Sequence, residues 1–358
     1  MFIFKKKIYL YLYIFFLILF FIFNEFSTNF ALSKNFIISE VEIEESYDLN
    51  FDKSKVIDKG FVKAFNILIF KVVEKKDRFK LQNVPLNEIK SLIDNFSIVD
   101  EKFINKKYRS QFEVQFNRKK IINFIEKKNI IPSLPKNIET FFLPILIDLK
   151  TNEVYYLSQN IFFNNWNNQL EKYFLINYIL PNEDIEDYSI IKKNISNIEN
   201  YDFNEIINKY NLNNNIVLVI VKSDNELRAF SKIKFGNKKM LMNKIFNNAD
   251  IKNKEQVNEL IFQIKENYED KWKMLNKINS SISLPIRILV ESNNIELTRK
   301  LEEALTNFDL VSDFKIERFD NKNIIYRIIY NSSPDKFLEN ITMFDFKIDH
   351  SSGIWKLK

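Results

Sequence analysis

The sequence predicts an α+β protein made of three small sheet-plus-helix units. Stretches in which apolar and polar residues alternate, the period of a half-buried strand, recur throughout the chain. Between them lie segments with an apolar residue every three or four positions, the period of an amphipathic helix. The 358 residues are enough for several domains, and strand and helix segments are mixed within each predicted unit.

The first 33 residues have the pattern of an export signal. Lys5–Lys7 precede an unbroken apolar run, Ile8–Phe23, and Ala31–Ser33 offers a small-x-small cleavage site. The run is shorter than the roughly 20 residues that a helix needs to cross a bilayer core. We therefore expect residues 1–33 to be a signal peptide or, if cleavage fails, an N-terminal anchor that associates with the membrane through residues 8–23. Either outcome predicts an exported protein, periplasmic or anchored in the inner membrane facing the periplasm.

The first unit, residues 36–131, is predicted to combine a sheet with helices. Val41 and Ile43 alternate with glutamates, as expected of a half-buried strand. Gly60 lies inside the long helix that follows. Because a glycine there costs about 1 kcal/mol, we expect close contact between this helix and the sheet. The elements predicted after the first strand are helices at Phe51–Val73, Pro85–Phe96 and Arg118–Lys128, and a hairpin of Ile98–Ile104 and Tyr108–Phe116.

The second unit, residues 138–248, is predicted to be a small sheet covered by helices. Phe141–Ile147 is continuously apolar, which is typical of a central buried strand. The run Phe162–Phe174, with Trp166 and Leu170 at helical spacing, predicts an amphipathic helix. The other predicted elements are strands at Ile176–Leu180, Ile216–Val221 and Leu227–Phe235, and helices at Asp184–Lys193 and Phe203–Tyr210.

A linking helix is predicted over residues 255–278. Apolar residues from Val257 to Leu275 recur every three or four positions, and the Lys and Glu residues are predicted to occupy the other face. The pattern leaves open which of the two neighbouring units the helix packs on.

The third unit, residues 284–358, has the order strand-helix-strand-strand-helix-strand. This order is typical of a ferredoxin-like fold, here with an added C-terminal strand. Ser333 precedes Pro334 and is predicted to cap the second helix. The predicted strands are Ile286–Val290, Phe314–Phe319, Ile324–Tyr330, Phe344–Ile348 and Ile354–Leu357, and the first helix covers Leu297–Phe308.

Composition removes several kinds of chemistry. The chain has no cysteine, one histidine and three glycines, so thiol catalysis, disulfides, zinc or copper sites and glycine-rich phosphate loops lack their residues. His350 is predicted to be a solvated turn residue, although Asp349, Ser351 and Ser352 adjoin it. The net charge of +6 is modest and dispersed, which argues against nucleic-acid binding. We expect no metal, no cofactor and no nucleic acid.

Two groups of residues remain as candidates for a site. The acidic cluster Asn182–Asp187 has the residue types of a glycosidase-like or calcium-binding site. It also follows Pro181, where acids favour the start of a helix, and we prefer this structural interpretation. The second group is the tryptophans, which would form a ligand platform if they were exposed. Trp166, Trp272 and Trp355 each lie on the apolar face of their predicted element, so we expect them to be buried.

Several short segments, spread over most of the chain, form a pattern of core positions. They are Val41–Ile43, Lys63–Phe65, Tyr108, Phe112–Phe116, Leu143–Leu146, Trp272–Asn276 and Gly353–Leu357. In these segments the chain resembles a family of uncharacterised exported proteobacterial proteins, the domain-of-unknown-function family 2066. The resemblance implies an envelope location, and it carries over no site residue. Alanine and glycine are scarcer here than in the family, so helix packing distances are expected to differ.

These observations predict a non-enzymatic protein of the bacterial cell envelope. It would act as an adaptor or assembly factor whose partners are other envelope proteins, and no catalytic, cofactor-binding or metal-ligating residue is assigned. The alternative is an envelope hydrolase that acts on glycan or peptide with carboxylates alone, for which the acidic cluster Asn182–Asp187 is the candidate.

Overall fold

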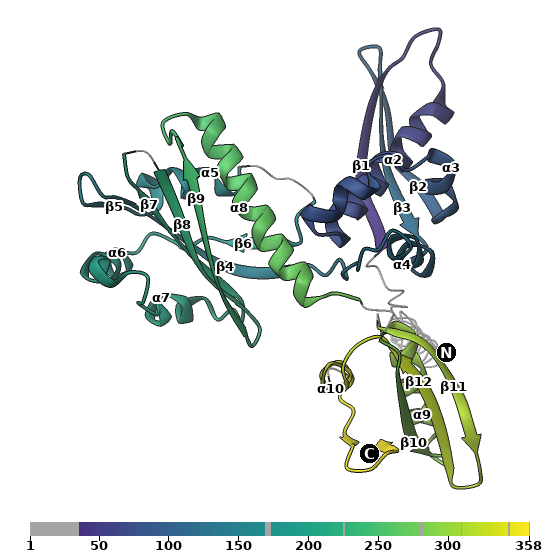
Figure 1. Cartoon of the computed structure of the whole chain (residues 1–358). Helices are drawn as coiled ribbons and strands as arrows, with labels where there is room; N and C mark the ends of the chain where they lie inside the picture. Colours follow the sequence, from purple (N-terminus) through teal and green to yellow (C-terminus); the bar gives the residue numbers. More distant parts are fainter. Residues whose placement is uncertain are drawn as a thin grey trace, which may run out of the picture. The chain divides into compact units, whose positions relative to one another are not determined.

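The computed structural model (Figure 1) describes residues 36–168, 173–224, 226–278, 282–308, 310–342 and 344–357. The predicted export segment, residues 1–33, and Leu170 lie outside the described residues. Helices and sheets are both present throughout, which confirms the predicted α+β class. Contacts divide the chain into two compact units, one within Asn35–Ser283 and one that begins at Leu284. Of the helices in the described part, none is long and apolar enough to cross a membrane.

The first sheet of the larger unit has three antiparallel strands in the order β1-β3-β2. The long helix α2 packs on one face through Gly60, where an added Cβ would lie 3.1 Å from the Phe112 ring. The close contact expected at this glycine is therefore confirmed. The elements are β1 (Ile37–Ser46), α2 (Lys53–Val72), the 3-10 helix η2 (Lys75–Leu81), α3 (Leu86–Ser91), β2 (Ile93–Ile104), β3 (Lys107–Phe116) and α4 (Arg118–Glu126).

One helix of this unit is shorter than its sequence pattern predicts. The helix expected over Pro85–Phe96 ends at Ser91, and β2 begins at Ile93. Ile93 pairs with Phe116 of β3, and Phe96 pairs with Val114. Hydrogen bonding to a neighbouring strand thus overrides the local helical pattern, because tertiary context outweighs helix propensity.

The second sheet of the larger unit has the order β5-β4-β7-β8-β9, and β6 pairs in addition with the first residues of β4. One face packs against α5 and α8, and the opposite face packs against α6 and α7. The elements are β4 (Ile138–Asp148), β5 (Glu153–Tyr155), η3 (Leu157–Gln159), α5 (Ile161–Trp166), β6 (Ile176–Ile179), α6 (Ile185–Lys193), η4 (Ile195–Asn197), α7 (Asn204–Ile207), η5 (Asn208–Tyr210), β7 (Asn215–Lys222), β8 (Glu226–Phe235), β9 (Lys238–Asn247) and α8 (Lys254–Leu275).

Two strands of this sheet, β5 and β9, are absent from the sequence prediction. β9 follows a two-residue loop, Gly236-Asn237, in which Gly236 adopts a φ of 55°. A glycine followed by asparagine between two extended runs is a recognised hairpin signal. The predicted helix Phe162–Phe174 is also shorter, since α5 ends at Trp166 and Phe174 lies outside it.

Helix α8 packs on the second sheet, which answers the question that the sequence left open. Val257, Ile261 and Ile264 are buried in the core that this sheet forms with α5. Near its C-terminal end the same helix also contacts the end of α2, where Lys273 donates hydrogen bonds to the α2 carbonyls. The helix is therefore buried on more than one side.

The smaller unit contains a five-stranded sheet in the order β11-β12-β10-β14-β13. Ser333 accepts a hydrogen bond from the Lys336 N–H at 3.3 Å, as predicted for a helix cap. The strand predicted at Phe344–Ile348 is confined to Ile348–Asp349, and β14 lies between it and β10. The elements are β10 (Leu284–Glu291), α9 (Ile295–Asn307), β11 (Val311–Phe319), β12 (Asn323–Tyr330), α10 (Pro334–Thr342), β13 (Ile348–Asp349) and β14 (Trp355–Leu357).

Candidate functional site

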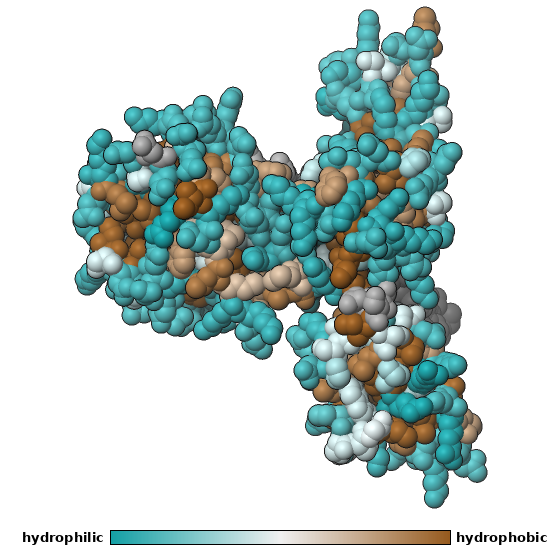
Figure 2. Space-filling model, viewed as in Figure 1, coloured by the Kyte–Doolittle hydropathy of each residue, from teal (hydrophilic) through white to brown (hydrophobic). Residues whose placement is uncertain are grey.

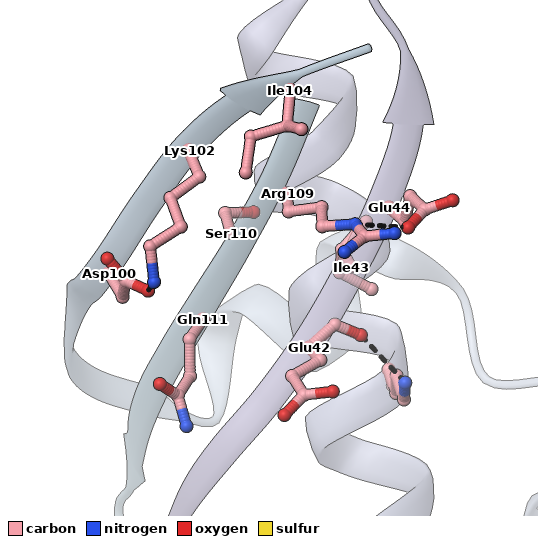
Figure 3. Close-up of a pocket in the computed structure, with 10 residues that line it drawn as sticks. Glu42, Ile43, Glu44, Asp100, Lys102, Ile104, Arg109, Ser110 and Gln111 are labelled. Carbon is pink, nitrogen blue, oxygen red and sulfur yellow. Dashed lines mark hydrogen bonds and ion pairs between the residues drawn. The ribbon is translucent and has the colours of Figure 1, made fainter. Parts of the chain in front are cut away.

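A charged groove lies on the first sheet, and Figure 3 shows the residues that line it. Side chains alternate between the two faces of a strand, so residues that do not face α2 collect on the open face. The strand register sets Glu44 of β1 beside Arg109 of β3, and Arg109 beside Lys102 of β2. The groove encloses about 540 Å³. Its lining residues are Glu42, Ile43, Glu44, Lys63, Asp100, Lys102, Ile104, Arg109, Ser110 and Gln111.

The charges in this groove are paired with one another. Lys107 and Arg109 both bind the carboxylate of Glu44, and these hydrogen bonds hold the pKa of Glu44 below its usual range. Lys102 donates to Asp100 at 2.5 Å and lowers the pKa of that carboxyl in the same way. Both carboxylates therefore stay ionised near neutral pH. A general acid needs a raised pKa, so this arrangement suits ion pairing with a ligand rather than proton transfer.

One edge of the same sheet is partly closed by a lysine. The ammonium group of Lys63, on α2, donates to the backbone carbonyl of Glu42 at 2.7 Å (Figure 3). That carbonyl lies on the edge strand β1 and is already bound by the Lys63 ammonium. A lysine side chain at an edge strand commonly protects the strand against unwanted pairing with another chain.

The acidic cluster Asn182–Asp187 forms the start of helix α6. The Asp184 side chain caps the helix by accepting from the Glu186 N–H at 2.8 Å. Lys209 binds both Asp184, at 2.5 Å, and the buried Asp187, at 2.7 Å. The hydrogen bond from Lys209 lowers the pKa of Asp184. The interpretation of these acids as a helix start is confirmed.

His350 is exposed, as predicted, and its ring lies edge-on to Trp355 at 6.0 Å. The hydroxyl of Ser351 donates to Asp349 at 2.7 Å. In the residues that the structure describes, no group of three or more His, Cys, Asp and Glu side chains is arranged to hold a metal ion.

Two of the three tryptophans are buried, as expected. Trp166 is fully buried and stacks on Phe142 with ring centroids 3.9 Å apart. Trp272 is 9% exposed, and its indole N–H donates to the Lys136 carbonyl at 2.7 Å. Trp355 is partly buried in β14. Trp166 and Trp272 are thus core residues and cannot form an exposed ligand platform.

The sequence pattern places the lysines and glutamates of α8 on the face other than the apolar one, but four of these charged side chains are buried. Lys265, Glu266, Glu269 and Lys273 are each 3% exposed or less. Lys265 and Glu269 lie against α5 and the start of β6. Glu266 lies against η2 and Lys273 against the end of α2, so these sides of the helix also lose contact with water. A pattern based on hydrophobicity assigns charged residues to water and contains no signal for this burial.

Each of these buried charges has a specific partner. The Glu269 carboxylate accepts from the N–H groups of Leu175 and Ile176, both at 2.9 Å, and burial raises its pKa. Lys265 donates to the Trp166 carbonyl at 2.6 Å and lies 5.4 Å from the Trp166 ring centre. Hydrogen bonding and ring contact offset the cost of burying these charges. Glu266 binds Arg78 at 2.8 Å and Lys75 at 2.5 Å.

Comparison of the chain with models of known protein families and with curated proteins finds no match. The resemblance to the domain-of-unknown-function family 2066 therefore stays a prediction.

Proposed function

We propose that this chain is an exported, non-enzymatic adaptor or assembly factor of the cell envelope, which binds other envelope proteins through the edges of its sheets. One observation carries the proposal: each of the three sheets has a long strand with exposed apolar side chains at one edge. Figure 2 shows apolar side chains exposed among hydrophilic ones on one face of the molecule. An edge strand offers unpaired N–H and C=O groups on which an extended segment can add.

The three edge strands are β2, β9 and β11, which have 12, 10 and 9 residues. Large apolar side chains on these strands are exposed to solvent, which is unusual for a strand whose outer edge is unpaired, because such edges are prone to aggregate. Binding to partner strands would use these side chains for specificity and the backbone for affinity. The exposed fractions are 63%, 55% and 47% for Val99, Phe103 and Ile104, 68% and 52% for Leu241 and Ile245, and 50% and 67% for Ile316 and Phe319.

The proposal is tested by crosslinking in living cells. A photoreactive amino acid is placed at Val99, Leu241 or Ile316, and at Ile185 as a control that is 84% exposed on helix α6. We expect an envelope protein to be captured from at least one edge position and not from Ile185. Equal capture at all four positions would contradict binding through sheet edges.

The predicted location has its own test. A tagged copy of the chain should fractionate with the periplasm or the inner membrane, and a soluble copy in the cytosol would overturn the envelope assignment. Mass spectrometry of the mature N-terminus then separates the two outcomes left open above. Cleavage after Ser33 gives a chain that starts at Lys34, whereas an intact Met1 indicates an anchor.

The hydrolase alternative is tested at the acidic cluster. Changing all four acids to their amides removes any carboxylate chemistry while retaining the shape of each side chain. We expect the cellular role to survive, with a loss of stability from the ion pairs of Lys209. Complete loss of the role in a variant that still folds would favour the hydrolase. The four acids are Glu183, Asp184, Glu186 and Asp187.

A further inference from the structure

The edge strand β9 differs from the other two edges in its charge. It contains Lys238, Lys239 and Lys244 and no acidic residue. In contrast, β2 contains three acids and one lysine, and β11 contains two acids and two bases. β9 pairs with β8 along one side, and within the described residues no strand pairs with its other side. A positive edge with available backbone groups is therefore present on the second sheet.

Lysines from the neighbouring strand add to this charge. Lys234 of β8 lies directly opposite Lys239 of β9 in the register. Like charges in this position repel each other, and no ion pair within the described part of the chain joins either lysine to a carboxylate. An anion supplied from outside would relieve this repulsion.

A pocket of about 440 Å³ lies at the same place. Its lining includes three lysines, Lys232, Lys234 and Lys239, one acid, Asp202, and the apolar side chains of Leu212 and Leu241, so its lysines outnumber its acids. The Lys232 ammonium is held in position because it donates to the Tyr201 carbonyl at 2.7 Å. Burial lowers the pKa of Lys232, and the charges of Asp202 and Glu199 act in the opposite direction; a further anion would stabilise its charged form.

The side chains on this face of β9 alternate in a way that defines a partner. Lys239, Leu241, Asn243 and Ile245 lie two residues apart and so share one face of the sheet. An added strand places its own side chains directly beside them. The partner that fits has an acidic residue at one position, then apolar, polar and apolar residues at every second position after it.

We propose that β9 binds an extended acidic segment of a partner protein as an additional strand, with a carboxylate beside Lys234 and Lys239 and apolar side chains beside Leu241 and Ile245. This inference rests on the proposed adaptor function and names the chemistry of one partner segment. Antiparallel pairing of β9 with β9 of a second copy could set Leu241 opposite Ile245, but β9 contains no acid, so a second copy would leave Lys234 and Lys239 without a carboxylate beside them.

The test uses the full chain and a labelled peptide, Glu-Thr-Val-Thr-Asn-Thr-Val-Thr-Glu. This peptide reads the same in both directions, so parallel and antiparallel addition present the same pattern. A second peptide has lysine in place of both glutamates. Binding is measured by fluorescence anisotropy at low ionic strength, where interactions between exposed charges are least screened. We expect the glutamate peptide to bind about 10-fold more tightly than the lysine peptide, since opposite charges attract and like charges repel across strands.

Charge reversal tests the position of the site. In the double variant with Lys234→Glu and Lys239→Glu, the preference should invert in favour of the lysine peptide. Lys238→Glu makes the same kind of charge change on the same strand but on the opposite face, and it should keep the original preference. The inference is overturned if neither peptide binds, or if the double variant and the control respond alike.

Backbone pairing is tested with a further peptide that is N-methylated at every amide. Alternate amides face β9, and which set does so depends on the direction of the peptide, so methylation of both sets should abolish binding in either direction. Undiminished binding of the methylated peptide would indicate charge attraction without strand addition and would reject the inference. Self-association of the wild-type chain that Lys239→Glu abolishes would assign this edge to a second copy instead. If neither peptide binds but crosslinking captures a partner at Val99 or Ile316, the proposed adaptor function is retained and only the proposed binding site at β9 is rejected.

Discussion

Replacement of Lys273 by methionine should change how the stability of the larger unit depends on pH. The Lys273 side chain is 1% exposed. Its ammonium group donates to the carbonyls of Phe70, at 2.5 Å, and Val73, at 3.3 Å, and lies 5.0 Å from the Phe70 ring centre. These carbonyls belong to the C-terminal end of α2, where a cation is favoured by the helix dipole. Methionine keeps most of the side-chain volume and removes the titrating group.

The size of the effect follows from the pKa of Lys273. Burial lowers it from 10.5 to about 8, and the charge of Arg78 acts in the same direction. Glu269, Asp270 and Glu266 oppose this with their negative charges. Between these two pKa values the unfolded chain holds a proton that the folded chain has released, so stability rises with pH. At about 1.4 kcal/mol for each pH unit, the wild type should gain up to about 3 kcal/mol between pH 8 and pH 10.5 relative to Lys273→Met.

The assay is denaturant unfolding at several pH values, followed by the fluorescence of the neighbouring Trp272. The difference in unfolding free energy between wild type and variant cancels the titration of all other groups. Lys254→Met, at an exposed lysine of the same helix, is the matched control for the loss of one charge. A difference that stays constant with pH, or that falls as pH rises, would refute the reasoning.

The remaining predictions concern packing. Trp272→Ala should lower the unfolding free energy by about 3–5 kcal/mol, because it removes the indole hydrogen bond to Lys136 and the edge contact with Phe235. The measurement is denaturant unfolding, and a loss under about 1 kcal/mol would be inconsistent with the burial of Trp272. Gly60→Ala should be destabilising by about 1 kcal/mol despite the better helix propensity of alanine, because its Cβ would lie 3.1 Å from the Phe112 ring. In the double variant with Gly60→Ala and Phe112→Leu the contact should be absent, and the loss of unfolding free energy caused by Gly60→Ala should disappear. If Gly60→Ala alone is stabilising, the Phe112 ring can move aside and the prediction is wrong.

The long, strongly periodic segments are where the sequence prediction was most successful. Helix α2 and strand β3 follow directly from helical and alternating patterns, because each buries one face against the same core. The start of α6 was also predictable, since Asp184 caps a helix through its own neighbours in the chain. Such features depend on residues close in sequence, and their physics is local.

The edges of the sheets could not be predicted in the same way. β9 does not alternate between polar and apolar residues, because Met240, Leu241 and Met242 are consecutive, and its extended conformation comes from pairing with β8. The groove in Figure 3 likewise depends on the register that places Arg109 between Glu44 and Lys102. The residue pattern of a single strand does not determine which strand it pairs with or in which register.

By itself the sequence determined the α+β class, most of the helices and strands, and the burial of Trp166 and Trp272, because apolar periodicity alone decides which faces leave water. The tertiary structure decided where the charges lie. Lys273 is buried because carbonyl groups about 200 positions earlier in the chain meet it at the end of another helix. A charged group leaves water only when partners of suitable geometry replace its hydration, and those partners exist only after the chain has folded.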